Sequence, residues 1–263
     1  MKIAVSGATG RMGKLIIEAV INSDDLKLVA AVTAPGVAEI GTDAGASLGK
    51  TTGVMITDDV QELAKADVLI DFTRPQATLA YLPFCIEHNV GIVIGTTGFD
   101  AQGKAQIAEA AKTVPVVFAP NMSVGVNSVL KLLEIAGAML SQYDCEIVEM
   151  HHKHKVDAPS GTALEMGRRV ALGRGVDFDS VAVLSREGHT GERPDGAIGF
   201  AALRGGDVVG DHTVIFAGPG ERIEISHKSG SRAGYAQGAV TAARFLKDKS
   251  NGLFPMSDVL GFN

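Results

Sequence analysis

The sequence predicts an α/β protein with two domains, and three observations lead to this prediction. Strand-like and helix-like runs alternate through the first half of the chain. A glycine-rich turn stands between the first strand-like run and the first helical run. In the second half, several strand-like runs follow one another with no helix between them. We therefore expect a doubly wound parallel sheet, followed by a smaller α+β domain with a mixed sheet.

The first half contains continuous apolar runs that are typical of buried strands, separated by segments with helical periodicity. Continuous rather than alternating apolar strands indicate a parallel sheet that is covered on both faces. The expected strands are residues 2–6, 28–33, 54–56, 67–71, 91–95 and 114–119. The expected helices are residues 11–21, 76–88 and 101–112. The loop over residues 35–53 is the least determined part of this half.

The pattern changes near Asn121, where the second domain is expected to begin. The expected helices here are residues 126–140 and 163–174, and an amphipathic helix over residues 233–247 precedes a mixed tail. The expected strands are residues 146–150, 181–185, 198–203, 208–217 and 222–227. Strands without intervening helices indicate antiparallel or mixed pairing.

Composition excludes several classes of protein. The chain has 263 residues, is 46% hydrophobic and has a mean hydropathy of +0.19, so it can bury a large core. Its net charge of −6 argues against nucleic acid or an anionic membrane as a partner. Cys85 and Cys145 form no CxxC motif, and the first residues lack the layout of a signal peptide. We expect a cytoplasmic protein with no membrane span.

The turn from Gly7 to Gly13 reads G-x-x-G-x-x-G and lies between the first expected strand and the first expected helix. Glycines allow a pyrophosphate to approach the backbone at the positive end of the helix dipole. This position makes a Rossmann dinucleotide site the favoured interpretation. Such sites usually have an acidic residue at the end of the second strand for NAD, but Thr33 and Ala34 stand there. The choice between NADH and NADPH is therefore open, and Arg11 with no nearby carboxylate slightly favours NADPH.

Other loops follow expected parallel strands at their carboxyl ends, where ligands bind in open α/β sheets. These loops are residues 71–73, 95–98 and 119–122. Each is a candidate cofactor contact, and ordinary loop structure is the alternative.

The segment from Glu146 to Thr162 gathers three imidazoles and two ammonium groups at residues 151–155 of an acidic protein. Such a cluster indicates an anionic ligand, and His151 or His152 is a natural proton donor near neutral pH. Lys155 could neutralise a carboxylate. Thr162 and Glu165 fit a capping box, so we expect a helix start there whose N–H groups form a second anion site. Adjacent histidines of an extended segment point to opposite faces, which argues against a metal site.

Several motifs, taken together, resemble those of the 4-hydroxy-tetrahydrodipicolinate reductase family, also called dihydrodipicolinate reductase. The motifs run in order through nearly the whole chain: GATGRMG, DFTRP, GTTG, APNMSVGVN, EIVEMHHKHKVDAPSGTAL and SHKSGSRAGYAQGAV. The resemblance implies reduction of a cyclic dicarboxylate by NADH or NADPH, with loss of water, to tetrahydrodipicolinate. This reaction belongs to the diaminopimelate route to lysine.

The resemblance also implies roles for individual residues. His151 matches the proton donor or acceptor, Lys155 matches the catalytic cation, and His152, Gly161 and Thr162 match substrate contacts. The matched cofactor contacts are Gly7, Ala8, Thr9, Gly10, Arg11, Met12, Gly95, Thr96, Thr97, Ala119, Pro120, Asn121 and Met122. At the ribose, Thr33 offers at most a hydroxyl.

The resemblance further implies a homotetramer built through the substrate domains and a nucleotide domain that includes the C-terminal helix. The implied domains are therefore residues 1–122 with 233–263 for the dinucleotide and residues 123–232 for substrate binding and tetramerisation.

Two other functions remain open from the residues alone. One is another two-domain dehydrogenase acting on a dicarboxylate, such as an amino-acid or semialdehyde dehydrogenase. A semialdehyde dehydrogenase would need an activated cysteine, and neither Cys85 nor Cys145 lies in a context that activates a thiol. The other is a regulator that binds a nucleotide without turnover. Arg232 is either a surface residue or a further anion contact.

Overall fold

The computed structural model describes residues 1–262, and the chain divides into two compact units. The first unit contains Met1–Val124 and the chain from Arg232 onward, and the second contains Gly125–Ser231. The first unit is thus built from two separate stretches of sequence.

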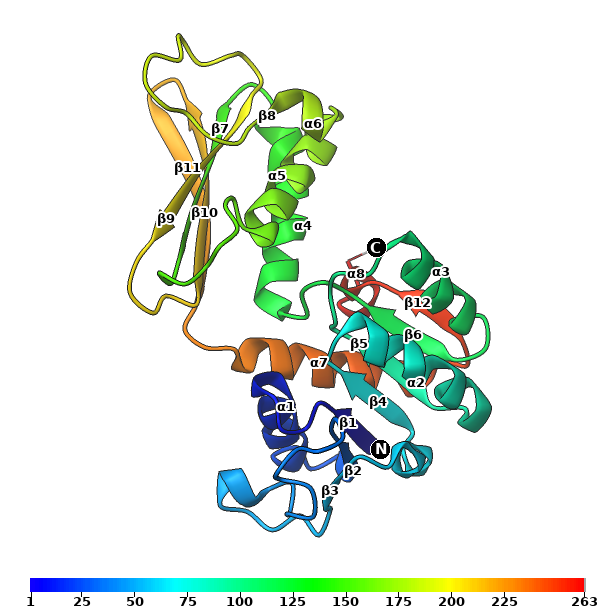
Figure 1. Cartoon of the computed structure of the whole chain (residues 1–263). Coiled ribbons are helices and arrows are strands. Elements are labelled where there is room, and N and C mark those ends of the chain that lie inside the picture. Colours follow the sequence, from blue (N-terminus) through cyan, green and yellow to red (C-terminus); the bar gives the residue numbers. More distant parts are fainter. Residues whose placement is uncertain (263) are drawn as a thin grey trace. The chain divides into compact units, whose positions relative to one another are not determined.

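The first unit contains a parallel sheet in the order β12-β6-β5-β4-β1-β2-β3, drawn in Figure 1. Each pair of neighbouring strands is parallel. The strands are β1 (Lys2–Ser6), β2 (Lys27–Val32), β3 (Ile56–Thr57), β4 (Val68–Asp71), β5 (Gly91–Ile94), β6 (Pro115–Phe118) and β12 (Gly252–Phe254). This arrangement confirms the predicted doubly wound α/β fold.

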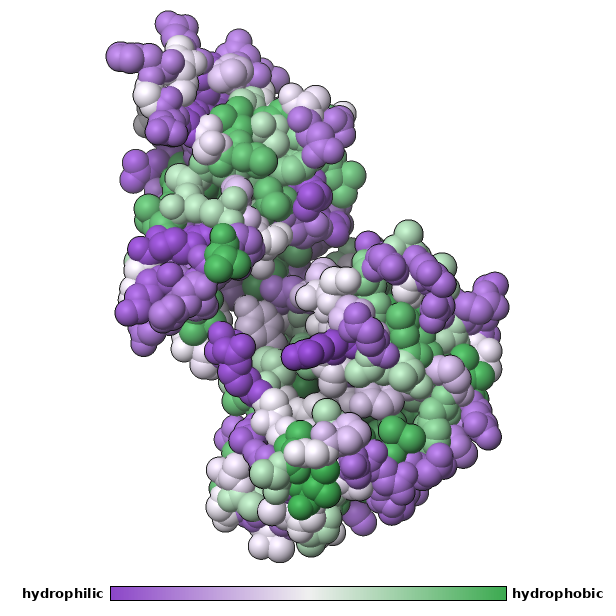
Figure 2. All heavy atoms as spheres, in the orientation of Figure 1, coloured by the Kyte–Doolittle hydropathy of each residue, from purple (hydrophilic) through white to green (hydrophobic). Residues whose placement is uncertain are grey.

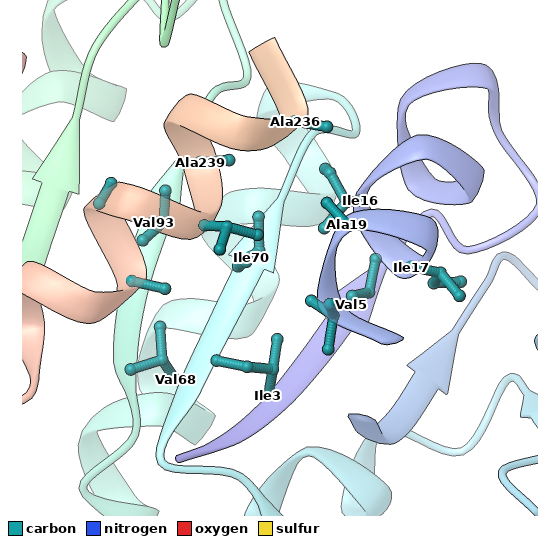
Figure 3. Close-up of a cluster of buried hydrophobic side chains, with 14 of the residues drawn as sticks. Ile3, Val5, Ile16, Ile17, Ala19, Val68, Ile70, Val93, Ala236 and Ala239 are labelled. Atoms are coloured by element: carbon teal, nitrogen blue, oxygen red, sulfur yellow. The ribbon is translucent and has the colours of Figure 1, made fainter. Parts of the chain in front are cut away.

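Both faces of this sheet are covered, which explains why its strands lack apolar alternation. All four residues of β4 and of β5 are buried. One face packs against α1 (Arg11–Ile21) and α7 (Ala233–Leu246), whose small and branched side chains meet Val5, Ile70 and Val93 in Figure 3. Residues of α2 (Pro75–His88) and α3 (Ala101–Ala110) belong to a second buried cluster. Burial of each such aliphatic side chain stabilises the fold by about 1.5–3 kcal/mol.

The remaining elements of the first unit are short. They are the 3-10 helices η1 (Ala46–Leu48) and η2 (Val60–Lys65) and the helix α8 (Met256–Val259). The loop before β3, which the sequence pattern left undetermined, is organised by Asp43. Its carboxylate accepts hydrogen bonds from Gly45 N, Thr52 N and Gly53 N at 2.8–3.0 Å. Although burial opposes the change, these bonds lower the pKa of Asp43 to about 2.

Strand β12 was not predicted from the sequence, which was read as a mixed tail there. It is three residues long, and only its register beside β6, with Gly252 opposite Pro115, makes it a strand. Helix α7 comes so close to the segment after β6 that a Cβ on Gly238 would lie 1.7 Å from the carbonyl oxygen of Met122. Glycine is therefore required at that crossing.

The second unit has a five-stranded sheet in the order β11-β10-β7-β9-β8. Strands β7, β9 and β8 are parallel neighbours, whereas β7, β10 and β11 are antiparallel, which confirms the predicted mixed sheet. The strands are β7 (Asp144–His151), β8 (Ala182–Val183), β9 (Ile198–Arg204), β10 (Gly210–Gly218) and β11 (Glu221–Ser229).

Three helices accompany this sheet: α4 (Val124–Met139), α5 (Gly161–Arg174) and α6 (Phe178–Val181). Helices α4 and α5 share a core with β7, β9 and β10 that contains Leu133, Val170, Ile147, Phe200 and Phe216. Burial along β7 alternates strictly, and its buried residues are Cys145, Ile147, Glu149 and His151. The period of the strand thus places a carboxylate and an imidazole together on the helix-covered face.

The crossing of α7 at Gly238 gives a test of the packing in the first unit. We expect Gly238→Ala to lower the free energy of unfolding by about 2–3 kcal/mol, because the added methyl group meets a backbone carbonyl that cannot move aside. Gly234→Ala in the same helix is the matched control, since its nearest neighbour would be Ser123 Oγ at 4.0 Å. That change should be neutral or stabilise by up to about 1 kcal/mol. Urea denaturation measures both, and equal effects would show that the crossing is not tight.

Candidate active site

One candidate site, in the first unit, is the glycine turn between β1 and α1. Gly7 has φ +62°, a conformation that favours glycine, and its carbonyl accepts a hydrogen bond from Gly10 N at 2.8 Å. A Cβ on Gly13 would lie 2.1 Å from the carbonyl oxygen of Gly7, so only glycine lets α1 approach the turn. The spacing therefore serves two purposes: Gly7 makes the turn, and Gly13 allows the helix to pack on it.

The start of α1 has the features of a phosphate site. Gly10 is its N-cap and provides no side-chain cap, and the first turn contains no acidic residue. The helix is 11 residues long, so its first N–H groups and its dipole are available to an anion. The backbone cradle and these donors fit the pyrophosphate of a dinucleotide.

The end of β2 has no charged side chain. Thr33 is 5% exposed, its N–H donates to Thr57 O, and its hydroxyl lies 3.0 Å from the hydroxyl of Thr9. Ala34 follows and is exposed. The hydroxyl expected to face a ribose is thus already paired with a residue of the glycine turn.

The ends of β4 and β5 are joined through Asp71. This carboxylate is fully buried and accepts hydrogen bonds from Thr73 Oγ1 at 2.6 Å and Thr96 Oγ1 at 3.2 Å. Thr96 therefore points inward, whereas the neighbouring Thr97 is exposed. A Cβ on Gly95 would lie 2.2 Å from the ring of Phe72, so glycine there makes room for the aromatic ring.

Most of the segment after β6, residues 119–122, is buried or hydrogen-bonded within the protein. Ala119 is buried and its N–H donates to Ile94 O, and Pro120 is exposed. Asn121 Oδ1 accepts a hydrogen bond from Ser123 N at 2.9 Å. Met122 is 1% exposed and belongs to the core of the first unit, so its side chain has a packing role.

A second candidate site, in the second unit, is centred on Glu149 and His151 of β7. Glu149 is 1% exposed, and its Oε2 lies 2.6 Å from His151 Nδ1. Arg204 of β9, opposite His151 in the register, donates to both carboxylate oxygens at 2.8 and 2.9 Å. Burial alone would raise the pKa of Glu149, but the hydrogen bonds from Arg204 and His151 lower it. Glu149 is therefore an ionised, fully bonded carboxylate that holds the imidazole by Nδ1.

A second histidine lies behind the first. The rings of His151 and His212 are 5.1 Å apart, and His212 Nε2 lies 3.1 Å from Ser160 Oγ. Burial, with repulsion from His151, lowers the pKa of His212 to about 4, so it is neutral at pH 7. A Cβ on Gly210 would lie only 3.0 Å from His151 Nε2. Glycine at this position of β10 therefore leaves room for the imidazole.

The predicted capping box at Thr162 and Glu165 is wrong. Ser160 is the N-cap of α5, and its hydroxyl accepts a hydrogen bond from Ala163 N at 3.2 Å. Thr162 is the second residue inside the helix, and Glu165 instead bonds to Arg169. Ser160 takes the cap because Glu149 Oε1 anchors its N–H at 3.1 Å, which fixes the backbone one residue before the helix. Gly161 and Thr162 thus form the first turn, which contains no acidic residue.

Lys155 is not a free cation in this structure. Its Nζ lies 2.7 and 2.9 Å from the carboxylate oxygens of Asp157, and this ion pair lowers the pKa of Asp157. Arg204 also donates to the carbonyl of Asp157 at 2.7 Å. The two residues with matched catalytic roles, His151 and Lys155, are therefore connected through Glu149, Arg204 and Asp157.

The other predicted substrate residues lie around this network. His152 N–H donates to Val208 O at 2.7 Å, and its Nδ1 is buried with no hydrogen-bond partner in the described chain. Gly161 is exposed, and a Cβ there would meet nothing within 4 Å. Arg232 belongs to the first unit, where it is the N-cap of α7. Within residues 1–262, no group of three histidine, cysteine or acidic residues could hold a metal ion.

Sequence reasoning missed four residues of the candidate site in the second unit: Glu149, Ser160, Arg204 and His212. Glu149 could have been found, since it precedes His151 by two positions in an extended run and so shares its face. Arg204 and His212 lie opposite β7 only through the pairing register of β9 and β10. No local signal in the sequence supplies that register.

Two family models together match almost the whole chain. The model described as dihydrodipicolinate reductase, N-terminus, matches residues 1–122, and the model for its C-terminus matches residues 125–260. Curated proteins named 4-hydroxy-tetrahydrodipicolinate reductase from Cupriavidus metallidurans and Burkholderia multivorans are each 60% identical to this chain, over 99% of both chains.

Solved structures share the fold at lower identity. A dipicolinate-bound dihydrodipicolinate reductase from Paenisporosarcina sp. TG-14 aligns with a TM-score of 0.77 at 24% identity, covering 97% of each chain. A probable dehydrogenase from Thermotoga maritima aligns with a TM-score of 0.61 at 15% identity, covering 98% of this chain and 92% of its own. These two structural similarities show the fold alone, whereas the family models and the 60% identical relatives show family membership. On that evidence, the chain belongs to the dihydrodipicolinate reductase family.

Proposed function

We propose that this protein reduces 4-hydroxy-tetrahydrodipicolinate to tetrahydrodipicolinate, with loss of water, in the diaminopimelate route to lysine. The observation that carries the proposal is the set of groups in the second unit. A buried imidazole held by Glu149, a lysine and the open start of α5 lie on neighbouring segments of one chain. These are the groups needed to bind a dicarboxylate and to exchange a proton.

The first unit, residues 1–122 with 233–263, is assigned the dinucleotide. A bound reduced nicotinamide cofactor supplies a hydride. The glycine turn, with Gly7, Ala8, Thr9, Gly10, Arg11 and Met12, receives the pyrophosphate. The loops with Gly95, Thr96 and Thr97, and with Ala119, Pro120, Asn121 and Met122, are assigned to the rest of the cofactor. The fit rests on the positive φ of Gly7 and the close approach at Gly13.

His151 is assigned the proton transfer. Its Nδ1 bonds to Glu149, which fixes the ring and leaves Nε2 as the nitrogen that exchanges a proton. Arg204 keeps the carboxylate of Glu149 ionised, so that it remains a hydrogen-bond partner for His151 Nδ1. The uncharged His212 behind the ring adds no competing positive charge near pH 7. The strand face thus supplies a proton donor with a fixed orientation.

The substrate carboxylates are assigned to two sites in residues 123–232. Lys155 provides the first, where a substrate carboxylate joins or replaces Asp157 on the ammonium group. Gly161 and Thr162 provide the second, because the first turn of α5 offers backbone N–H groups to an anion. His152, whose Nδ1 has no protein partner in the described residues, contacts the substrate as well.

A semialdehyde dehydrogenase is disfavoured by the state of the thiols. Burial raises the pKa of both Cys85 and Cys145 to about 12, and both side chains are fully buried. A thiol with such a pKa does not provide a thiolate nucleophile at neutral pH. The reductase assignment needs no thiol and no metal ion.

The protein is proposed to use NADPH or NADH, with some preference for NADPH. No acidic side chain follows β2 at Thr33, so nothing there repels a 2′-phosphate, and Arg11 stands at the start of α1, whose first turn contains no acidic residue. Without an acid, the discrimination against either cofactor is expected to be weak.

We further propose a cytoplasmic homotetramer assembled through the sheet of the second unit. The face of this sheet away from α4 and α5 carries Val148, Met150, Ala201, Leu203 and Ile215, of which Leu203 is 50% exposed. Hydrophobic residues are visible among hydrophilic ones on the surface in Figure 2. The same face also carries Glu146, Thr213, Glu224 and Lys228, and a sheet face that mixes apolar and polar side chains in this way suits another copy of the chain. No nucleic acid or membrane partner is proposed, and no helix within residues 1–262 meets the length and hydropathy needed to cross a bilayer.

Turnover tests the proposed function directly. The purified protein should oxidise NADPH and NADH when its substrate is generated in place by a dihydrodipicolinate synthase reaction. Omission of the synthase should abolish the oxidation, which absorbance of the reduced cofactor follows. A protein that binds either cofactor but shows no synthase-dependent oxidation would be the nucleotide-binding regulator instead.

Replacing Lys155 should lower kcat much more than replacing the nearby Lys153. We expect Lys155→Ala to lower kcat by about 10²–10³, the scale of losing one charge positioned for the transition state. Lys153→Ala is the matched control, since Lys153 is exposed and forms no ion pair in the described chain. It should retain kcat within about twofold. Steady-state kinetics measure both, and equal losses would mean that the segment contributes only its net charge.

Thr33 should control cofactor preference. We expect Thr33→Glu to raise the KM for NADPH by at least about tenfold relative to NADH, because a carboxylate at the end of β2 repels a 2′-phosphate. Thr33→Gln has a similar size without the charge and removes the same contact with Thr9. The Thr33→Gln change should alter the KM for NADPH and the KM for NADH by the same factor. If both variants leave the ratio of the two KM values unchanged, the ribose does not lie at Thr33.

A further inference from the structure

Asp71 is a buried carboxylate that the proposed mechanism does not use. It is the last residue of β4, is 0% exposed and is surrounded by four hydroxyl groups. Ser6 Oγ at 2.5 Å and Thr73 Oγ1 at 2.6 Å bond to Oδ1, whereas Thr78 Oγ1 and Thr96 Oγ1 bond to Oδ2. The hydroxyls come from four segments: β1, the loop after β4, α2 and the loop after β5.

The hydroxyls around Asp71 are placed to donate to a carboxylate. Each oxygen of Asp71 accepts from two hydroxyls, and Thr96 Oγ1 is itself the acceptor for Thr73 N at 2.9 Å, so its proton points to Asp71. A protonated carboxyl group, or an amide in its place, would bring a donor to hydroxyls that already donate. A hydroxyl such as Thr78 Oγ1, which also lies 3.3 Å from Arg74 O, would then have to turn its proton away. Within residues 1–262, no lysine, arginine or histidine forms an ion pair with Asp71. Its negative charge is solvated by hydroxyl dipoles and is not cancelled by a cation.

Asp71 lies at the edge of the sheet where the strand order reverses. The strand order runs β3-β2-β1-β4-β5-β6, so the direction of the winding reverses between β1 and β4. Asp71 pairs with Ser6 on one side and with Ile94 on the other, at the carboxyl ends of all three strands. Ligands of open α/β sheets bind in the crevice outside this reversal point.

The carboxylate also fixes the groups that line this edge. Because Thr73 Oγ1 bonds to Asp71, its methyl group turns toward the glycine turn, where a Cβ on Gly7 would be only 2.9 Å from it. Thr96, bonded to both Asp71 and Thr73 N, ties the loop after β5 to the loop after β4. One carboxylate thus holds the glycine turn and two neighbouring loops in a single arrangement.

We propose that Asp71 is a positioning residue whose uncompensated negative charge favours the oxidised over the reduced nicotinamide cofactor. The inference rests on the proposed function, because it assumes that this edge receives the nicotinamide. A reduced nicotinamide ring is neutral, and it becomes a cation when it gives up a hydride. A fixed anion at the carboxyl ends of β1, β4 and β5 stabilises that cation and so assists hydride donation.

A purely structural role would have a different consequence. If Asp71 only tied the loops together, its loss would weaken the binding of oxidised and reduced cofactor by the same factor. The charge acts on the two redox forms differently. The ratio of their dissociation constants therefore separates the two roles, and it is measured without turnover.

The test compares the binding of NADP⁺ and NADPH by titration calorimetry of the full chain. In Asp71→Asn we expect the affinity for NADP⁺ to fall relative to that for NADPH by about tenfold, the scale for unit charges roughly 10 Å apart at an effective dielectric of about 20. Thr78→Val is the matched control. It removes one hydroxyl from the same cluster but keeps the carboxylate, so both affinities should change by the same factor.

A second variant guards against misfolding of the first. In Asp71→Asn with Thr78→Val, the amide no longer faces the hydroxyl of Thr78, which removes one of the donor conflicts. The same tenfold change in the ratio is expected in whichever neutral variant folds, as judged by circular dichroism. An unchanged ratio in a folded neutral variant overturns the inference. Failure of the wild-type chain to bind either cofactor would overturn the proposed function instead, so the two failures are distinct.

Discussion

The candidate site in each unit depends on one constraint: a buried carboxylate must have its hydrogen bonds satisfied. An ionised carboxylate out of water is tolerated only when hydrogen bonds or charges replace its hydration. Asp71 meets this requirement with hydroxyls from four segments, and Glu149 meets it with Arg204, His151 and the N–H of Ser160. In each unit the groups that satisfy the carboxylate are those that shape the site. The two solutions differ in one respect: a cation neutralises Glu149, whereas only dipoles surround Asp71.

Much of the fold could be predicted because it follows from local periodicity. Helix α1 occupies the expected residues 11–21, and β7 extends the expected strand by two residues at its start and one at its end. Strand β12 could not be predicted, since Gly252–Phe254 has no strand pattern and pairs only because β6 offers an open edge. The cap of α5 was misplaced for a similar reason. Thr162 fits the sequence pattern of a capping box, but Ser160 is the N-cap because its N–H donates to Glu149, which is distant in sequence.

The candidate site was predictable in its residue types and not in its connections. The basic run at 151–155 indicated an anion site, but not that Lys155 would be paired with Asp157 or His151 with Glu149. Arg204 and His212 depend on strand register, which a single sequence does not specify. The glycines were more informative, because a close backbone approach excludes every other residue. Gly13 against Gly7 is such a case.

The internal pairing of the basic segment would allow an acidic protein to keep a selective anion site at the proposed substrate contacts. With a net charge of −6, the chain does not attract anions in general. Lys155 is occupied by Asp157, so a ligand must compete with a carboxylate already in place. A monocarboxylate would gain little from that exchange. A ligand with two carboxylates can also bind the first turn of α5, where no acidic side chain competes. For the proposed substrate, selectivity for a dicarboxylate would then follow from the second contact, which would add affinity that the first contact alone does not provide.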